Sequence, residues 1–401
     1  MGGRRKIGAG SRSEKMAELR EGLKTLPYLL RRESEMLRVL RSIVEIESFS
    51  AEKSAVDRCG VLVAAEFRRR GGRVRILRNA ARGNLVRIEI GAGRARESGQ
   101  LLVLGHLDTV YPSGTLRRMP FRVARGRAWG PGTFDMKGGI VLALFAVEAL
   151  RALGISPRRK IVFLWTGDEE IGSAASRATI EKEARRSQAV LVLEPALGLD
   201  GRAKTQRKGI GEFQILVHGR AAHAGVDPER GVNAAHELAL QIARLMKMNN
   251  PRRGITVQAN VISGGTATNV VPEFARAQVD VRFARARDGR GLQRRLLGLR
   301  PILKGARIEV RGGLNRPPLE RSAGVAALFH QAQAIAREIG FRLDEAATGG
   351  GSDGNFTAAL GVPTLDGIGV VGDGAHSLRE HVVIRELPRR AAMLAALLAS
   401  L

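Results

Sequence analysis

The chain has 401 residues, which is long enough for two domains that each bury a core of their own. Lysine and arginine (66) outnumber aspartate and glutamate (39) and give a formal charge of +27, but only 4% of the residues are aromatic. The basic residues are scattered without interleaved aromatic residues, so we interpret the charge as compositional and expect no specific nucleic-acid site. No apolar run reaches membrane-spanning length, and the single cysteine, Cys59, excludes an intrachain disulfide and a cysteine-based metal site.

Alternating helices and strands make up the first half of the chain. Residues 1–15 are basic and rich in glycine and serine, and they lack the apolar segment of a secretory signal, so we expect a disordered tail and a cytoplasmic protein. From residue 16, apolar spacing predicts helices over 15–47, 51–70, 137–153 and 176–186, and strands over 74–77, 84–90, 100–105, 160–166 and 189–193. This alternation predicts an α/β fold, with a mixed, mostly parallel sheet and helices on both faces, and its first part ends near residue 207.

A smaller α+β domain is expected over residues 208–316, inserted into the larger one. Polar and apolar residues alternate over 212–218, and further strands are predicted at 255–262, 276–283 and 306–310, with helices at 232–247 and 290–299. The sequence Arg-Pro-Pro at 316–318 suggests a return linker. The α/β pattern then resumes over 317–401, with helices at 322–339 and 387–401 and a strand at 364–367.

Carboxylates and imidazoles follow the predicted strands, at the edge where open α/β sheets bind ligands. They are His106 and Asp108, Asp135, Asp168 to Glu170, Glu194 and His376. Acidic side chains that converge without arginine partners repel one another, so we expect a cation between them. Histidine and carboxylate ligands without cysteine suit Zn²⁺, with Co²⁺ or Mn²⁺ as alternatives. A bridging carboxylate would allow two metals, and of the adjacent Glu169 and Glu170 one can bind metal while the other acts as general base.

The motifs at these positions resemble the M20 metallopeptidase family. They are GHLDTV at 105–110, DMKGG at 135–139, DEEIG at 168–172, EP at 194–195 and GAHS at 374–377. Their order and spacing match the family from about residue 35 to 400, and the likeness is greatest to its glutamate carboxypeptidase (carboxypeptidase G2-like) branch. That branch often carries a second acidic residue after the bridging aspartate, whereas Met136 stands here.

The resemblance implies a dizinc exopeptidase fold with two Zn²⁺ ions per subunit. Asp135 would bridge the ions, Glu169 would be the general base, and Asp108 would orient a ligating histidine. The remaining ligands would be His106 and Glu194 for one ion, and Glu170 and His376 for the other. The Asp135–Met136 peptide bond is expected to be cis.

The inserted domain would be the family's lid and dimerisation domain. His223 would reach the active site of a partner subunit and stabilise the oxyanion there. Five residues would hold the terminal carboxylate of the substrate: Asn269, Arg282, Gly350, Gly351 and Ser352. The resemblance therefore implies a homodimer acting on a small molecule, with no membrane partner.

Two activities fit the pattern. The first is hydrolysis of an amide bond next to a free carboxylate, in an acidic N-acylated amino acid or a peptide, as by a glutamate carboxypeptidase. The alternative is deacylation of N-acyl amino acids, as by acetylornithine deacetylase or succinyl-diaminopimelate desuccinylase. A third interpretation, an inactive relative that serves only as a binding module, is disfavoured because every expected ligand and the general base are present.

Overall fold

The computed structural model describes residues 24–91 and 98–401, which form two compact units. Of the described residues, the first comprises 24–91, 98–205, Arg321–Ala347 and Ser352–Leu401, and the second comprises Gln206–Glu320 and Thr348–Gly351. The second unit thus includes residues 348–351, which the sequence-based division assigned to the larger domain. The expected tail at 1–15 lies outside the described residues.

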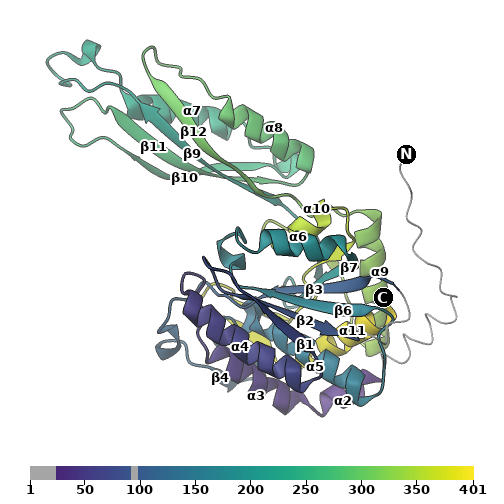
Figure 1. Ribbon diagram of the computed structural model, residues 1–401. Helices are drawn as coiled ribbons and strands as arrows, with labels where there is room; N and C mark the ends of the chain where they lie inside the picture. Colours follow the sequence, from purple (N-terminus) through teal and green to yellow (C-terminus); the bar gives the residue numbers. More distant parts are fainter. Residues whose placement is uncertain (1–23, 92–97) are drawn as a thin grey trace. The chain divides into compact units, whose positions relative to one another are not determined.

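A six-stranded mixed sheet forms the centre of the first unit (Figure 1), and its order is β1-β2-β6-β3-β7-β14. Strands β6, β3, β7 and β14 run parallel to one another, and at one edge of the sheet β2 pairs antiparallel with both β6 and β1. The strands are β1 (Arg73–Leu77), β2 (Leu85–Ile90), β3 (Gln100–His106), β6 (Lys160–Thr166), β7 (Ser187–Val192) and β14 (Thr364–Leu365). The expected mostly parallel sheet is confirmed.

Helices cover both faces of this sheet because successive residues of each buried strand point to opposite sides. Along β6, Phe163 and Trp165 join one apolar cluster, and Val162 and Leu164 join another on the opposite face. The helices on the larger side are α2 (Thr25–Leu30), α3 (Glu33–Val44), α4 (Lys53–Arg69), α5 (Gly138–Ala152), α9 (Ala323–Ile339) and α11 (Glu386–Ser400). On the other side are α6 (Arg177–Arg185) and α10 (Gly354–Ala359), as Figure 1 shows.

Two small sheets in the chain were not predicted, because their strands are too short for a hydrophobic period. One has the order β15-β16-β5-β4 and is wholly antiparallel. Its strands are β4 (Arg122–Ala124), β5 (Arg127–Trp129), β15 (Gly372–Asp373) and β16 (His381–Val383). The other pairs β8 (Ala203–Arg207) with β13 (Glu345–Thr348), the two strands in which the chain passes from one unit to the other.

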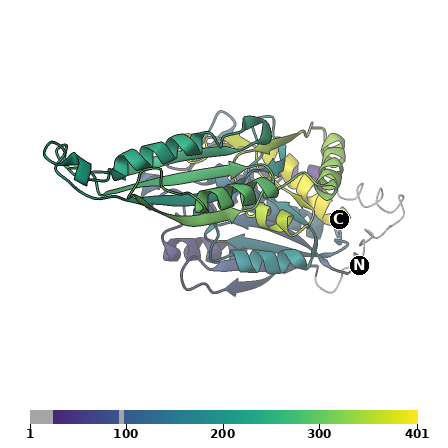
Figure 2. The ribbon, with the colours of Figure 1, turned by 90° about the horizontal axis from the view of Figure 1, so that it is seen from above.

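An antiparallel four-stranded sheet with two helices along one face makes up the second unit (Figures 1 and 2). Its strand order is β10-β11-β9-β12, and inward-facing residues such as Phe213, Val281 and Phe283 pack against the helices. The elements are β9 (Gly209–His218), α7 (Ala234–Met246), β10 (Thr256–Gly264), β11 (Phe274–Phe283), α8 (Ala286–Leu297) and β12 (Arg307–Arg316). The last strand extends to Arg316, so the expected linker begins inside β12.

Within the two described stretches of the chain, no helix combines the length and the apolar character that crossing a membrane requires.

Candidate metal centre and active site

Three adjacent parallel strands bring the predicted ligands to one edge of the central sheet. His106 pairs with Thr166 at the end of β3 and β6, and Leu104 pairs with Val192 at the end of β7. The segments that continue beyond β6 and β7 carry Glu170 and Glu194, so parallel register alone places their backbones near His106. The sheet therefore brings Glu170 and Glu194, each more than sixty positions from His106 in sequence, to the ligand-binding edge where His106 lies.

The fourth segment of the site precedes α5 and packs closely against these strand ends. Gly105 lies at the end of β3, and a Cβ there would come within 2.4 Å of the Met136 side chain. The backbone N–H of His106 donates to the sulfur of Met136 at 3.2 Å. The peptide bond between Asp135 and Met136 is cis, as expected. The absence of a side chain at Gly105 therefore leaves the space that the side chains of Met136 and Trp165 occupy beside the strand.

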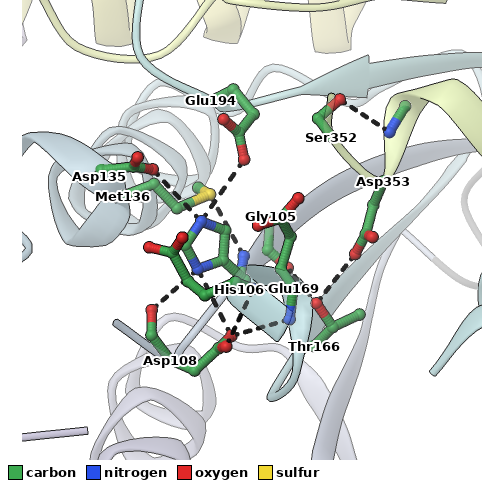
Figure 3. Close-up of polar contacts among 12 residues, drawn as sticks. Gly105, His106, Asp108, Asp135, Met136, Thr166, Glu169, Glu194, Ser352 and Asp353 are labelled. Carbon is green, nitrogen blue, oxygen red and sulfur yellow. Dashed lines mark hydrogen bonds and ion pairs between the residues drawn. The ribbon is translucent and has the colours of Figure 1, made fainter. Parts of the chain in front are cut away.

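His106 is 1% exposed and lies between Asp108 on one side and Asp135 and Glu194 on the other (Figure 3). Its Nε2 is 3.4 Å from Oδ1 of Asp135 and 3.4 Å from Oε1 of Glu194. Its Nδ1 is 2.9 Å from the backbone oxygen of Asp108, which fixes the ring with Nε2 towards the carboxylates. In the neutral ring this contact keeps the proton on Nδ1 and leaves Nε2 free to bind a metal.

Asp135 also faces a second group of ligands with its other oxygen. Its Oδ2 is 3.3 Å from Nε2 of His376, and that nitrogen is 3.2 Å from Oε2 of Glu170. The potential ligand atoms of each group lie within 4.8 Å of one another. The five predicted ligands thus form two groups that share one carboxylate, which is the arrangement of a dinuclear site.

Electrostatics support a cation between these groups. Burial would lower the pKa of His106, but the nearby carboxylates of Asp108, Asp135 and Glu194 raise it well above its usual value. Contacts with Asp135 and Glu170 raise the pKa of His376 to about 10. Both shifts favour positive charge on the imidazoles, which is what converging carboxylates require when no metal is bound.

Three buried atoms of the site lack hydrogen-bond partners among the residues that the structure describes. They are Nε2 of His106, Oδ1 of Asp135 and Oε1 of Glu170. Buried polar atoms without partners are costly, and each of these belongs to a group that can ligate a metal. The residues present therefore fit two metal ions with nitrogen and oxygen ligands, and Zn²⁺ suits that donor set.

The carboxylate of Asp108 holds the turn that carries Glu169 and Glu170. Its two oxygens accept the backbone N–H groups of Glu169 and Glu170, each at 3.2 Å, and the hydroxyl of Ser50 donates to it at 2.7 Å. The distance from its Oδ1 to Nδ1 of His106 is 3.5 Å. Asp108 was expected to orient His106. In the structure its backbone carbonyl makes the shorter contact with that ring, while its side chain fixes the Glu169–Glu170 turn.

Glu380 is a buried carboxylate of the site that the sequence did not reveal. It lies four residues after His376, accepts the backbone N–H groups of Phe134 and Asp135 at 2.8 and 2.9 Å, and accepts the Tyr111 hydroxyl at 2.5 Å. Burial raises the pKa of Glu380 to about 7. The acidic residue soon after His376 was visible in the sequence, but its partners are about 250 positions away.

The predicted lid residues lie in the second unit, apart from Ser352. His223 is exposed, and its Nδ1 accepts the N–H groups of Gly225 and Val226, each at 3.1 Å. Asn269 lies beside it, because its backbone oxygen accepts the N–H of Ala224 at 2.9 Å. These contacts bring His223 and Asn269 together from two loops that are more than forty residues apart.

The other predicted substrate-binding residues already have partners within their own units. The guanidinium of Arg282 pairs with both oxygens of Asp280, with contacts of 2.8 to 3.1 Å. The carbonyl oxygens of Gly350 and Gly351 accept from one nitrogen of Arg207, at 3.2 and 3.0 Å. Ser352 belongs to the first unit, where it is fully buried and its hydroxyl donates to Asp366 at 2.5 Å.

Comparison with known proteins agrees with this site. Residues 102–400 match the protein family that is described as "Peptidase family M20/M25/M40". Carboxypeptidase G2 from Pseudomonas sp. (strain RS-16) is 32% identical over 371 residues, which are 91% of this chain and 89% of that protein. Succinyl-diaminopimelate desuccinylase from Dechloromonas aromatica (strain RCB) is 32% identical over 323 residues, covering 75% of this chain and 83% of that protein.

The fold has solved counterparts as well. The aminopeptidase PepT from Bacillus cereus superposes with a TM-score of 0.75 at 21% identity, over 92% of this chain and 98% of that one. At that identity the likeness concerns the fold alone. The expected dizinc exopeptidase-type architecture is confirmed, and the family match covers the motifs that carry both ligand groups. The chain therefore belongs to peptidase family M20/M25/M40 and is a metal-dependent hydrolase of that family.

Proposed function

We propose that the protein is a dinuclear zinc carboxypeptidase that cleaves an amide bond next to a free carboxylate, in the manner of a glutamate carboxypeptidase. The observation that carries the proposal is the position of Asp135, whose two oxygens face two separate ligand groups, at 3.4 Å from His106 and 3.3 Å from His376. The similarity to carboxypeptidase G2 over most of both chains supports the substrate class.

The chain's own residues have distinct parts in this reaction. When bound, the two metal ions would activate a water molecule and polarise the scissile carbonyl. Glu169 takes a proton from the attacking water and delivers it to the leaving nitrogen, so that the amine departs neutral. Asp108 holds this residue in place through the backbone N–H of Glu169. His223, contributed by a partner subunit, stabilises the oxyanion that forms at the attacked carbonyl.

The terminal carboxylate of the substrate would bind to the five residues predicted for it. The planar guanidinium of Arg282 can donate two parallel hydrogen bonds to a carboxylate. It now pairs with Asp280, and it would remain paired if the substrate carboxylate took the place of Asp280. The rest of this set consists of Asn269, Gly350, Gly351 and Ser352.

The proposed enzyme acts as a homodimer in the cytoplasm. Sedimentation analysis tests the dimer, and a monomer that keeps full activity would contradict the role of His223.

Substrate profiling tests the proposed activity against its alternative. Purified protein with two equivalents of Zn²⁺ is assayed with folyl-glutamate, simple dipeptides, N-acetyl amino acids and N-succinyl-diaminopimelate. We expect the highest kcat/KM for an acyl-glutamate. The similarity to the desuccinylase supports the alternative, an N-acyl amino acid deacylase, and preference for the succinylated substrate would establish it instead.

A matched variant tests the general base. Glu169→Gln keeps the size of the side chain and the backbone contact with Asp108, but it cannot accept the proton. We expect the variant to bind two metals and its kcat to fall at least about a thousandfold. This fall is within the rate enhancement that a general base typically contributes. A variant that keeps more than a tenth of the wild-type kcat would remove Glu169 from this role.

A further inference from the structure

The side chain of Glu380 joins three segments of the site that are distant in sequence. One oxygen accepts the backbone N–H groups of Phe134 and Asp135, and the other accepts the Tyr111 hydroxyl. The oxygen of this hydroxyl also lies 2.9 Å from the backbone oxygen of Ser377. Because Glu380 is fully buried, these contacts are not exchanged with water, and they tie the bridging aspartate to the loop that carries His376.

The loop of His376 needs such a tie more than the other ligand segments do. His376 has a φ of +61°, a left-handed conformation that costs a non-glycine residue roughly 1–2 kcal/mol. Its side chain is 52% exposed, so packing holds it little. The loop is closed by hydrogen bonds from the backbone N–H of Ser377 to Gly374 and from that of Glu380 to Ser377, at 3.0 and 3.1 Å.

The first ligand group is supported differently. His106 ends the central strand β3, is 1% exposed, and has its Nδ1 fixed by the backbone of Asp108. Glu194 follows β7, the neighbouring parallel strand. The central sheet itself thus sets the distance between His106 and Glu194, and this distance does not depend on Glu380.

We propose that Glu380, held by Tyr111, is a positioning residue for the second metal ion, the one bound by Asp135, Glu170 and His376. It fixes the separation between the bridging carboxylate and the imidazole of His376, and so sets the affinity of that ion. The first ion, bound by His106, Asp135 and Glu194, depends on Glu380 only through the shared Asp135. This inference rests on the dinuclear centre proposed above.

Metal titration of the metal-free protein tests the proposal without measuring activity. Co²⁺ is added in steps and followed by its absorption spectrum, and Zn²⁺ binding is followed by calorimetry. We expect wild-type protein to bind two ions and Glu380→Ala to bind the second at least about tenfold more weakly, because loss of groups that support metal ligands typically costs 10- to 100-fold in affinity. The first ion should bind within threefold of wild type.

Three variants distinguish positioning from general damage to the fold. Glu380→Gln keeps an oxygen for the two N–H groups and should restore most of the second affinity, and Tyr111→Phe should have a smaller effect than Glu380→Ala. Glu237 is a matched control in the second unit, since it is also fully buried and accepts the backbone N–H groups of Ile302 and Leu303. Glu237→Ala should lower stability but leave both metal affinities unchanged.

The outcomes separate this proposal from the one on which it rests. If wild-type protein binds only one ion, the dinuclear centre is wrong. If wild-type binds two ions and folded Glu380→Ala binds both with wild-type affinity, the centre stands and the role of Glu380 is refuted. Equal weakening of both ions in Glu380→Ala would also refute it, because the structure assigns the support of Glu380 to the second group.

Discussion

Replacement of Asp108 with alanine removes the acceptor from three donors at once. The Ser50 hydroxyl donates to its carboxylate at 2.7 Å, and the backbone N–H groups of Glu169 and Glu170 do so at 3.2 Å. Asp108 is fully buried, so water does not replace these contacts without rearrangement of the turn. The variant therefore affects both the stability of the first unit and the position of the proposed general base.

The expected magnitude follows from these contacts. Hydrogen bonds to a charged group contribute about 1.5–3 kcal/mol each, and the two 3.2 Å contacts belong at the lower end, so we expect a loss of about 3–5 kcal/mol in the free energy of unfolding. For a unit of this size, that loss lowers the Tm by about 6–15 °C. Ser50→Ala removes only one of the three donors and should cost about 1.5 kcal/mol.

The assay compares thermal unfolding of the metal-free variants with turnover of the metal-loaded ones. We expect Asp108→Ala to reduce kcat about a hundredfold or more, because misplacement of a catalytic group by 1 Å can cost that much. The exposed Asp200, replaced with alanine, is the control and should change neither quantity. Unfolding of Asp108→Ala within 2 °C of wild type, or an equal fall in Tm for Ser50→Ala, would refute the structural role of the Asp108 carboxylate.

Three further predictions concern protons and buried charges. In metal-free protein, contacts with Asp135 and Glu170 raise the pKa of His376 to about 10, so the ring of His376 is protonated at pH 7.5. Metal loading should thus release at least about one proton, from His376, measured by calorimetry in buffers of different ionisation enthalpy, and no release would contradict this. Arg390 is 1% exposed and donates to three backbone carbonyls at 2.9 to 3.2 Å. Arg390→Met should therefore lower the free energy of unfolding, measured by urea titration, by about 2–4 kcal/mol. An unchanged urea midpoint would disprove this contribution of Arg390. Burial raises the pKa of Glu183, but Arg87 and its other hydrogen-bond partners lower it overall, so this pair stabilises the fold above the unfolded pKa of about 4.3 and loses its effect as the pH falls through the folded value. The difference in Tm between wild type and Arg87→Met should therefore shrink between pH 6 and 3, and a constant difference would exclude the pair as its source.

The chemistry of the metal site was readable in the sequence because the ligands follow strands. The apolar runs before His106 and Glu194 predict buried strands, and the carboxyl ends of parallel strands meet at one edge of a sheet. The apolar pattern of the strands and this rule of sheet topology were thus sufficient to predict that the ligands lie close together. The motifs then identified the family, and the structure places all five predicted ligands in two groups.

Only the tertiary structure decided how these ligands are held. The hydrogen bond from Tyr111 to Glu380 spans 269 residues, and the one from Phe134 to Glu380 spans 246. Such side-chain contacts have no period and no spacing that a sequence displays. The same holds for Asp108, which the motif marked as important. Whether its carboxylate or its backbone carbonyl meets His106 depends on the turn at Glu169, because that turn offers two N–H groups that compete for the carboxylate.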